Sequence, residues 1–506
     1  MNMQENNPYD QIPYTSYPFA QTHPNRLATM AALHGIQPTP ITNCRVLEVG
    51  CGDGANLIPM ALGLPDSQFV GFDLAAKPVE RGREIISDLG LTNIDLRQAN
   101  LMEFDDEPFD YIITHGLYAW VPPVVQDGLM ALCQRLLKPN GVAYISYNAY
   151  PGCHLREMTR EMMLFHVRGN KDPRDSMNQG LSLLRFILDQ YPSESAARED
   201  LYGAIVTEQF EMLARHRHRE QVYHDHLAEN YRPAYFFQFI GHAAQHGLQY
   251  LSEASYSDMT DYKFPPSVRE LLAQFDDEQA VQREQYLDFL KGRSFRQTLL
   301  CRDNLKVQRT IASEQVKSFY LSSEIEIMAE APDLSSGVVE AFEGPKGARI
   351  QTDFPLAKAA LVILKEQWPR SLTWDELQTA AIERVKQHQS DSFTAEHLQA
   401  LAEIMLAAFG SGVIQLHSHR PEIQLAVTSH PVAYSLARWQ AQHGTVVTNL
   451  MHASVILENE VSKQLVRLLD GTRDHAALIA DLTVVMEPRL PLKINEETTI
   501  DDRVTL

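Results

Sequence analysis

The pattern of apolar and polar positions changes along the chain. From residue 45 to 147, short apolar runs alternate with longer segments of helical character. The predicted strands are 45–49, 68–72, 94–98, 109–114 and 141–147, and the predicted helices are 25–34, 55–62, 77–89 and 124–137. The turn Lys138–Gly141 is expected to end the last helix and start the fifth strand. This alternation predicts a parallel, doubly wound α/β sheet with ligands at the carboxyl ends of its strands.

A glycine-rich turn follows the first predicted strand. Gly50, Gly52 and Gly54 alternate with other residues directly after the apolar run that contains Glu48. Glycines in such a turn allow positive φ and let a ligand approach the backbone closely. Asp73 ends the second predicted strand 19 residues after Gly54, where an acid that binds a ribose diol is expected. The two motifs together predict a nucleotide-type cofactor.

The residues around the turn distinguish between two cofactors. A dinucleotide loop reads G-x-G-x-x-G and faces a pyrophosphate. Here the third glycine comes one position earlier, and the acid Glu48 would repel a pyrophosphate. An acid suits the ammonium and sulfonium of S-adenosylmethionine, which we therefore predict as the cofactor. The predicted cofactor-binding residues are Glu48, Gly50, Cys51, Gly52, Gly54, Asn56, Asp73, Leu74, Asn100, Leu101, His115 and Gly116.

The rest of the chain divides into further predicted units. Residues 153–240 read as helices, and 247–256 and 294–301 read as strands six and seven of a methyltransferase sheet, the last antiparallel. Residues 315–352 predict a hairpin around Glu343–Gly347, and three helices and a strand after it suggest a winged helix. The predicted units are an N-terminal arm at 1–40, a cofactor-binding core at 41–152, a helical middle block at 153–240, the completion of the sheet with the regulatory domain at 241–305, and a C-terminal α+β winged-helix-like domain at 306–506. The arm, which includes Tyr9, Pro13 and Tyr14, is expected to fold over the cofactor cleft.

Composition restricts the partners. The 506 residues include 44 basic and 65 acidic ones, and a net charge of −21 opposes a nucleic-acid surface, which needs a basic stripe. The five cysteines are scattered without a C-x-x-C motif, as expected for a reduced, cytoplasmic compartment. No apolar leader and no run of 18 apolar residues is present, so we expect neither a signal peptide nor a membrane span.

Long strings of the sequence resemble one family. The strings are Leu47–Cys51, Asn56–Met60, His115–Pro122, Asn140–Gly152, His224–Asn230, Phe295–Leu300 and Leu469–Asp474. In these residues the chain resembles the bacterial class I methyltransferases that carry a methyltransferase regulatory domain, among them the rickettsial protein lysine methyltransferases. The resemblance implies S-adenosylmethionine as the cofactor, a winged-helix-like C-terminal part and a lysine-containing protein as the substrate. Cys153 departs from the tryptophan expected after Pro-Gly, which concerns the shape of the acceptor pocket.

The loops after strands four and five carry the candidate catalytic residues. Methyl transfer requires alignment of the reactants, exclusion of water and loss of a proton from the acceptor. Aromatic side chains can hold an ammonium and lower its pKa by desolvation. The predicted catalytic residues are Tyr118, Trp120, Tyr147 and Tyr150 as an aromatic wall, with Asn148 fixing the acceptor nitrogen. His115 is expected to position the cofactor, with a role as proton acceptor as the alternative.

Two histidine groups raise the question of a metal. His216, His218, His224 and His226 are interleaved with arginines, so we expect a solvated helix surface. His242 and His246 lie one helical turn apart without an evident third ligand, and we predict no metal. The alternatives to a protein lysine methyltransferase are a small-molecule O- or N-methyltransferase and a non-catalytic cofactor-binding module.

Overall fold

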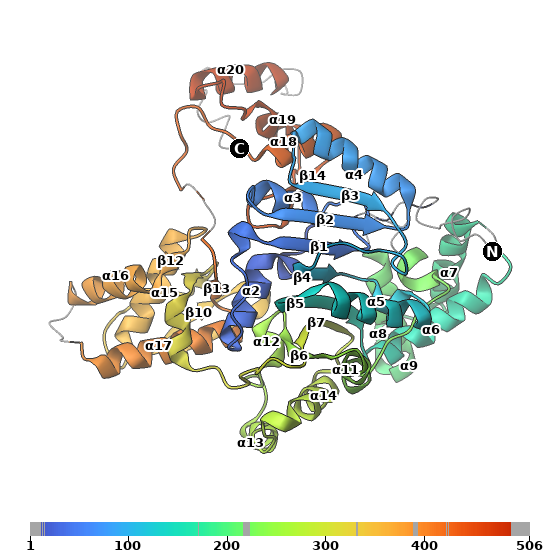
Figure 1. Ribbon diagram of the computed structural model, residues 1–506, viewed down its shortest axis with the longest axis horizontal. Helices are drawn as coiled ribbons and strands as arrows, with labels where there is room; N and C mark the ends of the chain where they lie inside the picture. The colour runs from blue at the N-terminus through green and yellow to red at the C-terminus, as the bar shows by residue number, and fades with distance from the viewer. Residues whose placement is uncertain are drawn as a thin grey trace.

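A seven-stranded sheet forms the centre of the computed structural model, which describes residues 12, 14, 16–170, 172–215, 223–329, 332–387, 393–420, 423 and 425–486 (Figure 1). The strand order is β3-β2-β1-β4-β5-β7-β6. The strands are β1 Arg45–Val49, β2 Gln68–Asp73, β3 Ile94–Gln98, β4 Phe109–Thr114, β5 Leu137–Asn148, β6 Leu248–Glu253 and β7 Phe295–Arg302. Strands β1 to β5 pair in parallel, and β7 lies antiparallel between β5 and β6. The predicted seven-stranded methyltransferase sheet is confirmed.

Helices lie on both sides of this sheet (Figure 1). They are α2 Pro24–Leu33, α3 Leu57–Gly63, α4 Ala76–Leu89, α5 Pro123–Leu136, α11 Phe236–Gln245, α12 Tyr256–Met259 and α14 Ala280–Lys291, and α13 Pro266–Leu272 lies farther from the sheet, below α14 in Figure 1. Because both faces are covered, the central strands are continuous apolar runs, and every residue of β4 is buried.

The start of β5 differs from the sequence prediction. The strand begins at Leu137 and runs through the expected turn Lys138–Gly141. Leu137 pairs with Phe109, and the register shifts before Tyr111 pairs with Val142. A bulge therefore absorbs the turn residues, and the Lys138 Nζ donates to buried Asp110 at 2.8 Å, which holds them against β4.

A buried ionic cluster fastens the last two strands. Arg296 of β7 has no exposed surface and forms ion pairs with Glu253 of β6 and with Glu284 and Asp288 of α14. Removing one partner of such a cluster leaves an uncompensated buried charge, which destabilises strongly. Residues more than 40 positions apart are thus held at one edge of the sheet.

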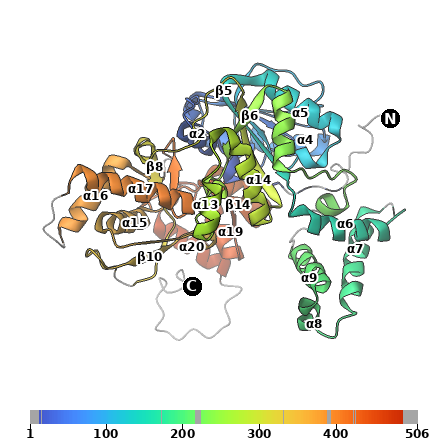
Figure 2. The same cartoon turned by 90° about the horizontal axis from the view of Figure 1, so that it is seen from below.

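The middle block stands apart from the sheet. Its elements are α6 Cys153–His166, α7 Pro173–Leu188, α8 Glu194–Glu199, α9 Leu201–Ala214 and a π-helical turn Tyr223–Leu227. They enclose an apolar core of their own that includes Met163, Leu184 and Val206. Figure 2 shows α7, α8 and α9 extending away from the body of the molecule.

The C-terminal part consists of two pieces. The first contains β8 Tyr320–Ser322, β9 Glu326–Ile327, β10 Glu340–Glu343, β11 Arg349–Thr352, α15 Pro355–Gln367, β12 Leu372–Thr373, α16 Trp374–Lys386, α17 Ala395–Ser411 and β13 Gln415–His417. The predicted hairpin is β10–β11, in which Glu343 pairs with Arg349. The second piece contains α18 Ser435–His443, β14 Val446–Thr448, β15 Ser454–Ile456, α19 Glu460–Leu468 and α20 His475–Met486.

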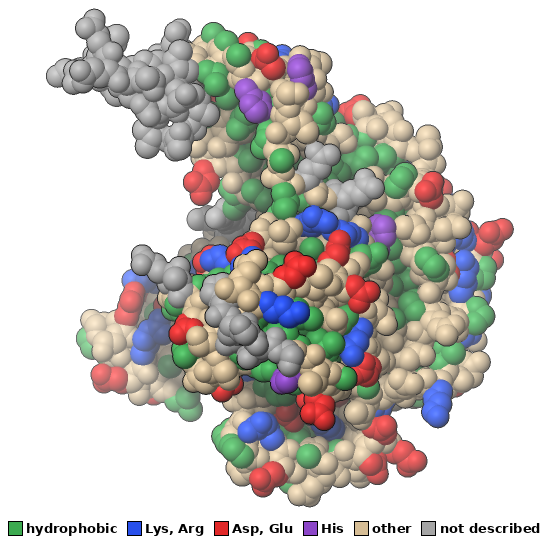
Figure 3. Space-filling model, turned by 90° about the vertical axis from the view of Figure 1, so that its left-hand side faces the viewer, with side chains coloured by type: hydrophobic (Ala, Val, Ile, Leu, Met, Phe, Trp, Pro, Cys, Tyr) green, Lys and Arg blue, Asp and Glu red, His purple; other side chains and the backbone are tan. Residues whose placement is uncertain are grey.

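The second piece packs against the sheet domain. The Tyr434 hydroxyl donates to the carbonyl oxygen of Pro59 at 2.9 Å, and the Trp439 indole donates to Asp88 at 2.9 Å. Figure 3 shows the molecule hollowed between this upper lobe and the part below it, with lysine and arginine side chains beside the hollow. Among the described helices, none has the length and apolar character needed to cross a membrane.

Candidate functional site

The glycine turn and the acid of β2 meet as predicted. Gly50, Gly52 and Gly54 have φ values of 74°, 55° and 75°, the left-handed region that favours glycine. The Asp73 carboxylate accepts the N–H of Gly52 at 3.0 Å and the N–H of Ala75 at 2.8 Å. Asp73 is thereby held beside the turn at the carboxyl edge of the sheet.

Glu48 is a buried acid with one oxygen that lacks a partner. Its Oε1 accepts from Asn56 Nδ2 at 2.7 Å, whereas Oε2 is buried and has no hydrogen-bond partner in the described part of the chain. Burial raises the pKa of Glu48 to about 8, with smaller contributions from the nearby carboxylates of Asp53 and Asp73. A cation beside Oε2 would favour the ionised carboxylate. The residues therefore fit a ligand with a positively charged group.

Asn56 connects Glu48 to distant parts of the chain. Its Oδ1 accepts from the Phe19 N–H at 2.9 Å, from the Thr22 hydroxyl at 3.1 Å and from His452 Nε2 at 2.9 Å. His452 belongs to the second C-terminal piece, is buried and has a φ of 55°. Sequence reasoning proposed Asn56 as a cofactor ligand but missed these partners, because no local pattern links residues 396 positions apart.

The described end of the N-terminal arm lies over the turn. A side-chain carbon at Gly52 would come within 3.0 Å of the Ser16 hydroxyl. The Phe19 ring stacks on His115, with 3.8 Å between ring centroids. The aromatic and proline residues of the arm before residue 12, such as Tyr9, and Pro13 itself lie outside the described residues.

His115 follows β4 and is held by two hydroxyls. Its Nδ1 lies 3.0 Å from the Tyr144 hydroxyl and 3.2 Å from the Ser146 hydroxyl. Burial lowers the pKa of His115 to about 4, so the ring is neutral at physiological pH. The backbone N–H of Gly116 also donates to Ser146, at 2.8 Å.

The other predicted cofactor residues occupy the ends of neighbouring elements. Leu74 is exposed after β2, and Asn100 and Leu101 follow β3 with Leu101 buried. The Asn100 side chain accepts the N–H of Met102 at 3.1 Å, which shapes the loop. Cys51 is buried within the turn.

The four predicted aromatic residues fall into separate groups. Tyr118 lies 5.8 Å from Tyr147, and both contact Phe239 of α11, so the structure brings these two together. Trp120 packs on Tyr231 at 4.9 Å, and Tyr150 stacks on His154 at 4.1 Å.

Two predicted catalytic residues, Tyr147 and Asn148, are buried, and so is Cys153. Tyr147 is 1% exposed, with its ring stacked on Phe239 at 4.1 Å. Asn148 is buried, and its backbone carbonyl oxygen accepts the N–H of Ala234 at 3.2 Å. The Cys153 thiol donates to the carbonyl of Ser294 at 3.1 Å, in the place where the resemblance led us to expect tryptophan.

Tyr118 begins a chain of hydrogen bonds that sequence reasoning missed. Its hydroxyl lies 2.9 Å from His242 Nδ1, and His242 Nε2 lies 3.4 Å from the Asp127 carboxylate of α5. His246 Nε2 also contacts Asp127, at 2.8 Å, and these bonds lower the pKa of Asp127, that from His246 most. The ionised carboxylate only accepts, so a neutral His242 carries its proton on Nε2 and accepts the Tyr118 hydroxyl proton at Nδ1.

The histidines of the middle block differ from the prediction where they are described. His224 and His226 are buried, not solvated, because the π-helical turn packs inward. His224 Nε2 lies 2.9 Å from the carbonyl oxygen of Ile12, and His226 contacts Arg156. His216 and His218 lie outside the described residues. Within the described ranges, the group of three side chains close enough to hold a metal is Asp127, His242 and His246.

Comparison with known proteins gives matches along nearly the whole chain. Family models match a methyltransferase domain at residues 41–180, a predicted methyltransferase regulatory domain at 218–302 and a PKMT C-terminal winged helix domain at 429–505. An uncharacterized protein of Rickettsia prowazekii is 33% identical over 486 residues, which are 94% of this chain and 85% of that protein. The structure of PKMT2 from Rickettsia typhi in complex with AdoHcy matches with a TM-score of 0.83 and 27% identity over 97% of both chains.

Proposed function

Because this chain belongs to the family of bacterial class I methyltransferases that carry a methyltransferase regulatory domain, we propose that it methylates lysine side chains of a protein substrate. It is an S-adenosylmethionine-dependent methyltransferase. The observation that carries the proposed acceptor is the likeness to PKMT2, which extends over 97% of both chains and so reaches far beyond the catalytic sheet.

The residues at the carboxyl edge of the sheet suit this cofactor. S-adenosylmethionine supplies an electrophilic methyl group on a sulfonium. Asp73 would hold the ribose diol, and the backbone of Gly50–Gly54 permits close approach. Glu48 would face the ammonium with its unpartnered Oε2, which the cation would return to the ionised state. Phe19 and His115 would close the site against water.

The Tyr118 chain supports removal of the acceptor proton. A lysine amine with a pKa of about 10.4 attacks only after losing its proton. In the proposed step, the lysine ammonium gives a proton to the Tyr118 oxygen while the Tyr118 hydroxyl proton moves to His242 Nδ1. His242 then becomes an imidazolium that faces the Asp127 carboxylate. Tyr118 acts as a phenol in this step, since burial raises its pKa to about 12.

Radiolabelling tests the substrate class. The purified full chain is incubated with tritiated S-adenosylmethionine and a lysate of the same species, and the label is followed into protein and small-molecule fractions. Label in a protein band that yields methyllysine on acid hydrolysis is the expected result, with Asp73→Ala as the cofactor-binding control. Label in small molecules instead would contradict the lysine proposal and favour the small-molecule methyltransferase. Cofactor binding without any transfer would favour the non-catalytic module.

A further inference from the structure

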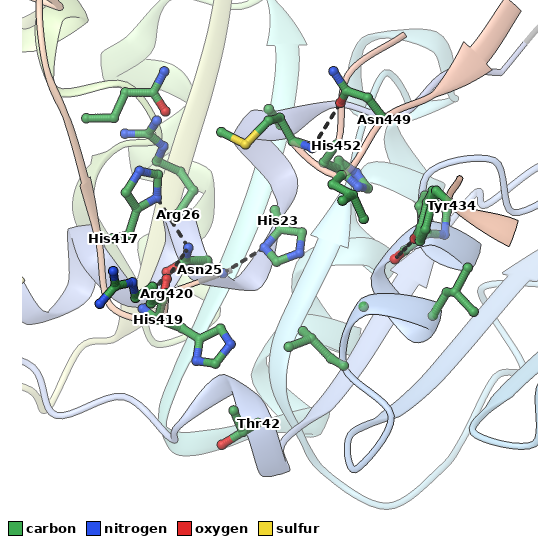
Figure 4. Close-up of a pocket in the computed structure, with 18 of the residues that line it drawn as sticks. His23, Asn25, Arg26, Thr42, His417, His419, Arg420, Tyr434, Asn449 and His452 are labelled. Atoms are coloured by element: carbon green, nitrogen blue, oxygen red, sulfur yellow. Dashed lines mark hydrogen bonds between the residues drawn. The ribbon is translucent and has the colours of Figure 1, made fainter. Parts of the chain in front are cut away.

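A cavity outside the predicted cofactor site is lined in part by Pro59, Leu62 and Gly63 of α3. It encloses about 500 Å³ and is bordered by α2, by the end of α3 and by the loops after β13 and β14 (Figure 4). Thr42, which precedes β1, also lines it, so the cavity lies toward the amino end of that strand, away from the predicted cofactor site. The cofactor residues Gly50–Gly54 and Asp73 are not among its lining residues.

Basic side chains from three segments gather in this cavity. They are His23, Arg26, His417, His419, Arg420 and His452. The acidic residue in the described lining is Asp66, which is exposed. Burial lowers the pKa of His23 to about 4 and that of His417 to about 3, so these rings are neutral and the positive charge of the lining comes from Arg26 and Arg420. The local chemistry therefore suits a negatively charged ligand.

Arg26 is the strongest sign of a missing partner. In the described part of the chain, its guanidinium has no hydrogen bond and no ion pair, and burial lowers its pKa. Arg420 differs, because it contacts the Glu376 carboxylate at 3.3 Å. The Arg26 side chain is half-buried, and a guanidinium there would make strong, paired hydrogen bonds with a carboxylate or phosphate.

Neighbouring histidines are held in defined orientations. His23 Nδ1 accepts the N–H of Asn25 at 3.1 Å, so the neutral ring carries its proton on Nε2. His417 is fixed by Ser322 at 2.8 Å and by Asn25 at 3.4 Å. Figure 4 shows His23, Arg26 and His417 around one side of the cavity. These histidines do not form a metal-binding group of three within the described ranges.

We propose that this cavity is a binding site for a small organic anion that carries a phosphate or carboxylate group. Arg26 would form a paired interaction with the anionic group, and His23 Nε2 would donate a further hydrogen bond. The volume falls within the range of small-molecule sites, and Leu64, Leu416 and Met451 provide apolar surface for the rest of the ligand. The site is separate from methyl transfer and does not depend on the lysine proposal.

Calorimetry on the full chain tests the proposal with two probes. Inorganic phosphate and citrate are titrated separately, with sodium chloride in the cell adjusted to keep the ionic strength constant. Saturable binding of at least one anion is expected, and the stronger probe identifies the anionic group. Arg26→Gln should weaken binding by about 10-fold or more, as expected for loss of hydrogen bonds from a charged donor.

Matched variants keep the outcome interpretable. Arg185→Gln removes an exposed arginine of α7 that pairs with Asp189, and it should bind the anion like the wild type. Asp73→Ala should also retain anion binding, which separates the cavity from the cofactor site. If Arg26→Gln does not fold, Arg26→Lys and His23→Ala replace it, with weaker binding expected in both. Absence of saturable binding to both anions, or binding unchanged in folded Arg26 and His23 variants, would overturn the proposal.

Discussion

The glycine-turn site and the basic cavity have opposite electrostatic character. The first contains buried Glu48, with an oxygen that lacks a donor, and the second contains Arg26, with a guanidinium that lacks an acceptor. Buried polar groups normally have partners, since leaving one unpartnered costs about 1–3 kcal/mol. Each region thus has a polar side chain without a partner, and the charge of that side chain predicts a ligand of the opposite charge.

The two regions share one hydrogen bond. His452 lines the basic cavity and also donates to Asn56, which in turn donates to Glu48. His452 has a left-handed backbone conformation, which is uncommon outside glycine. The Asn56 amide thus contacts one residue of each region.

The largest expected effect is on the stability of the cofactor-free protein. Because burial raises the pKa of Glu48 from 4.5 to about 8, the folded state holds this proton more tightly than the unfolded state. The free energy of unfolding therefore falls as pH rises from about 4.5 to about 8, by roughly 5 kcal/mol at most. Glu48→Gln should remove this loss, so its gain in melting temperature over the wild type should grow across this pH range and then stay level.

Thermal melts of the two proteins at matched scan rates and several pH values measure this gain. Glu80→Gln, at an exposed position of α4, is the control and should follow the wild type. A gain that does not change with pH would contradict the assignment of the raised pKa to Glu48.

The hydrogen-bond chain from Tyr118 through His242 to Asp127 differs from both regions, because its groups have hydrogen-bond partners before any ligand binds. His242→Gln removes the group that receives the proton, so kcat should fall by about 100-fold, the lower end for general base catalysis. Steady-state kinetics with a lysine-containing substrate measure this loss, and KM for S-adenosylmethionine should change little. His166→Gln, at the exposed end of α6, is the matched control. Equal loss of kcat and cofactor affinity would indicate a structural role instead.

Asp73→Ala tests the glycine-turn site, which we expect to bind the positively charged cofactor. The variant should lose contacts to the ribose diol of the cofactor and the bond to Gly52, which together are worth about 1.5–3 kcal/mol. Calorimetry with S-adenosylmethionine should show affinity reduced by roughly 10- to 150-fold. Asp95→Ala on the adjacent strand should bind normally, and unchanged affinity in Asp73→Ala would remove the assignment.

The smallest expected effect concerns the hydrogen bond between His452 and Asn56, which connects the two regions. His452→Ala leaves Asn56 with one donor fewer, so the affinity for S-adenosylmethionine should fall by about 5-fold, equivalent to about 1 kcal/mol. His452→Gln retains a donor and should restore much of the affinity. Separate measurements of KM and kcat distinguish this positioning role from general destabilisation, since only KM for S-adenosylmethionine should rise. Failure of glutamine to restore affinity would break the proposed connection.

Local sequence patterns were sufficient to predict the strands of the central sheet. Strands buried on both faces produce continuous apolar runs, and glycine turns separate them from helices, so β6 and β7 were found despite the long helical block before them. The same reasoning misplaced the start of β5, because a bulge and the contact between Lys138 and Asp110 allow a turn sequence to remain extended.

Site residues at the ends of adjacent strands could be predicted from the sequence as well as the strands themselves. The turn at Gly50–Gly54 and the acid Asp73 occupy the ends of adjacent strands, where topology brings them together. The pair His242 and His246 was visible from helical spacing, but Asp127 on α5 was not, because the packing of two helices decides that contact. Burial of His224 and His226 was decided in the same manner by the packing of a π-helical turn.

The sequence by itself determined the class of fold, the cofactor turn and the family, since these depend on periodicity and on short motifs with fixed spacing. Only the tertiary structure decided which polar groups lack partners and which distant residues meet. The bond between Asn56 and His452 and the cavity around Arg26 each require segments from both ends of the chain. Such contacts depend on how complete elements pack, and no window of neighbouring residues contains that information.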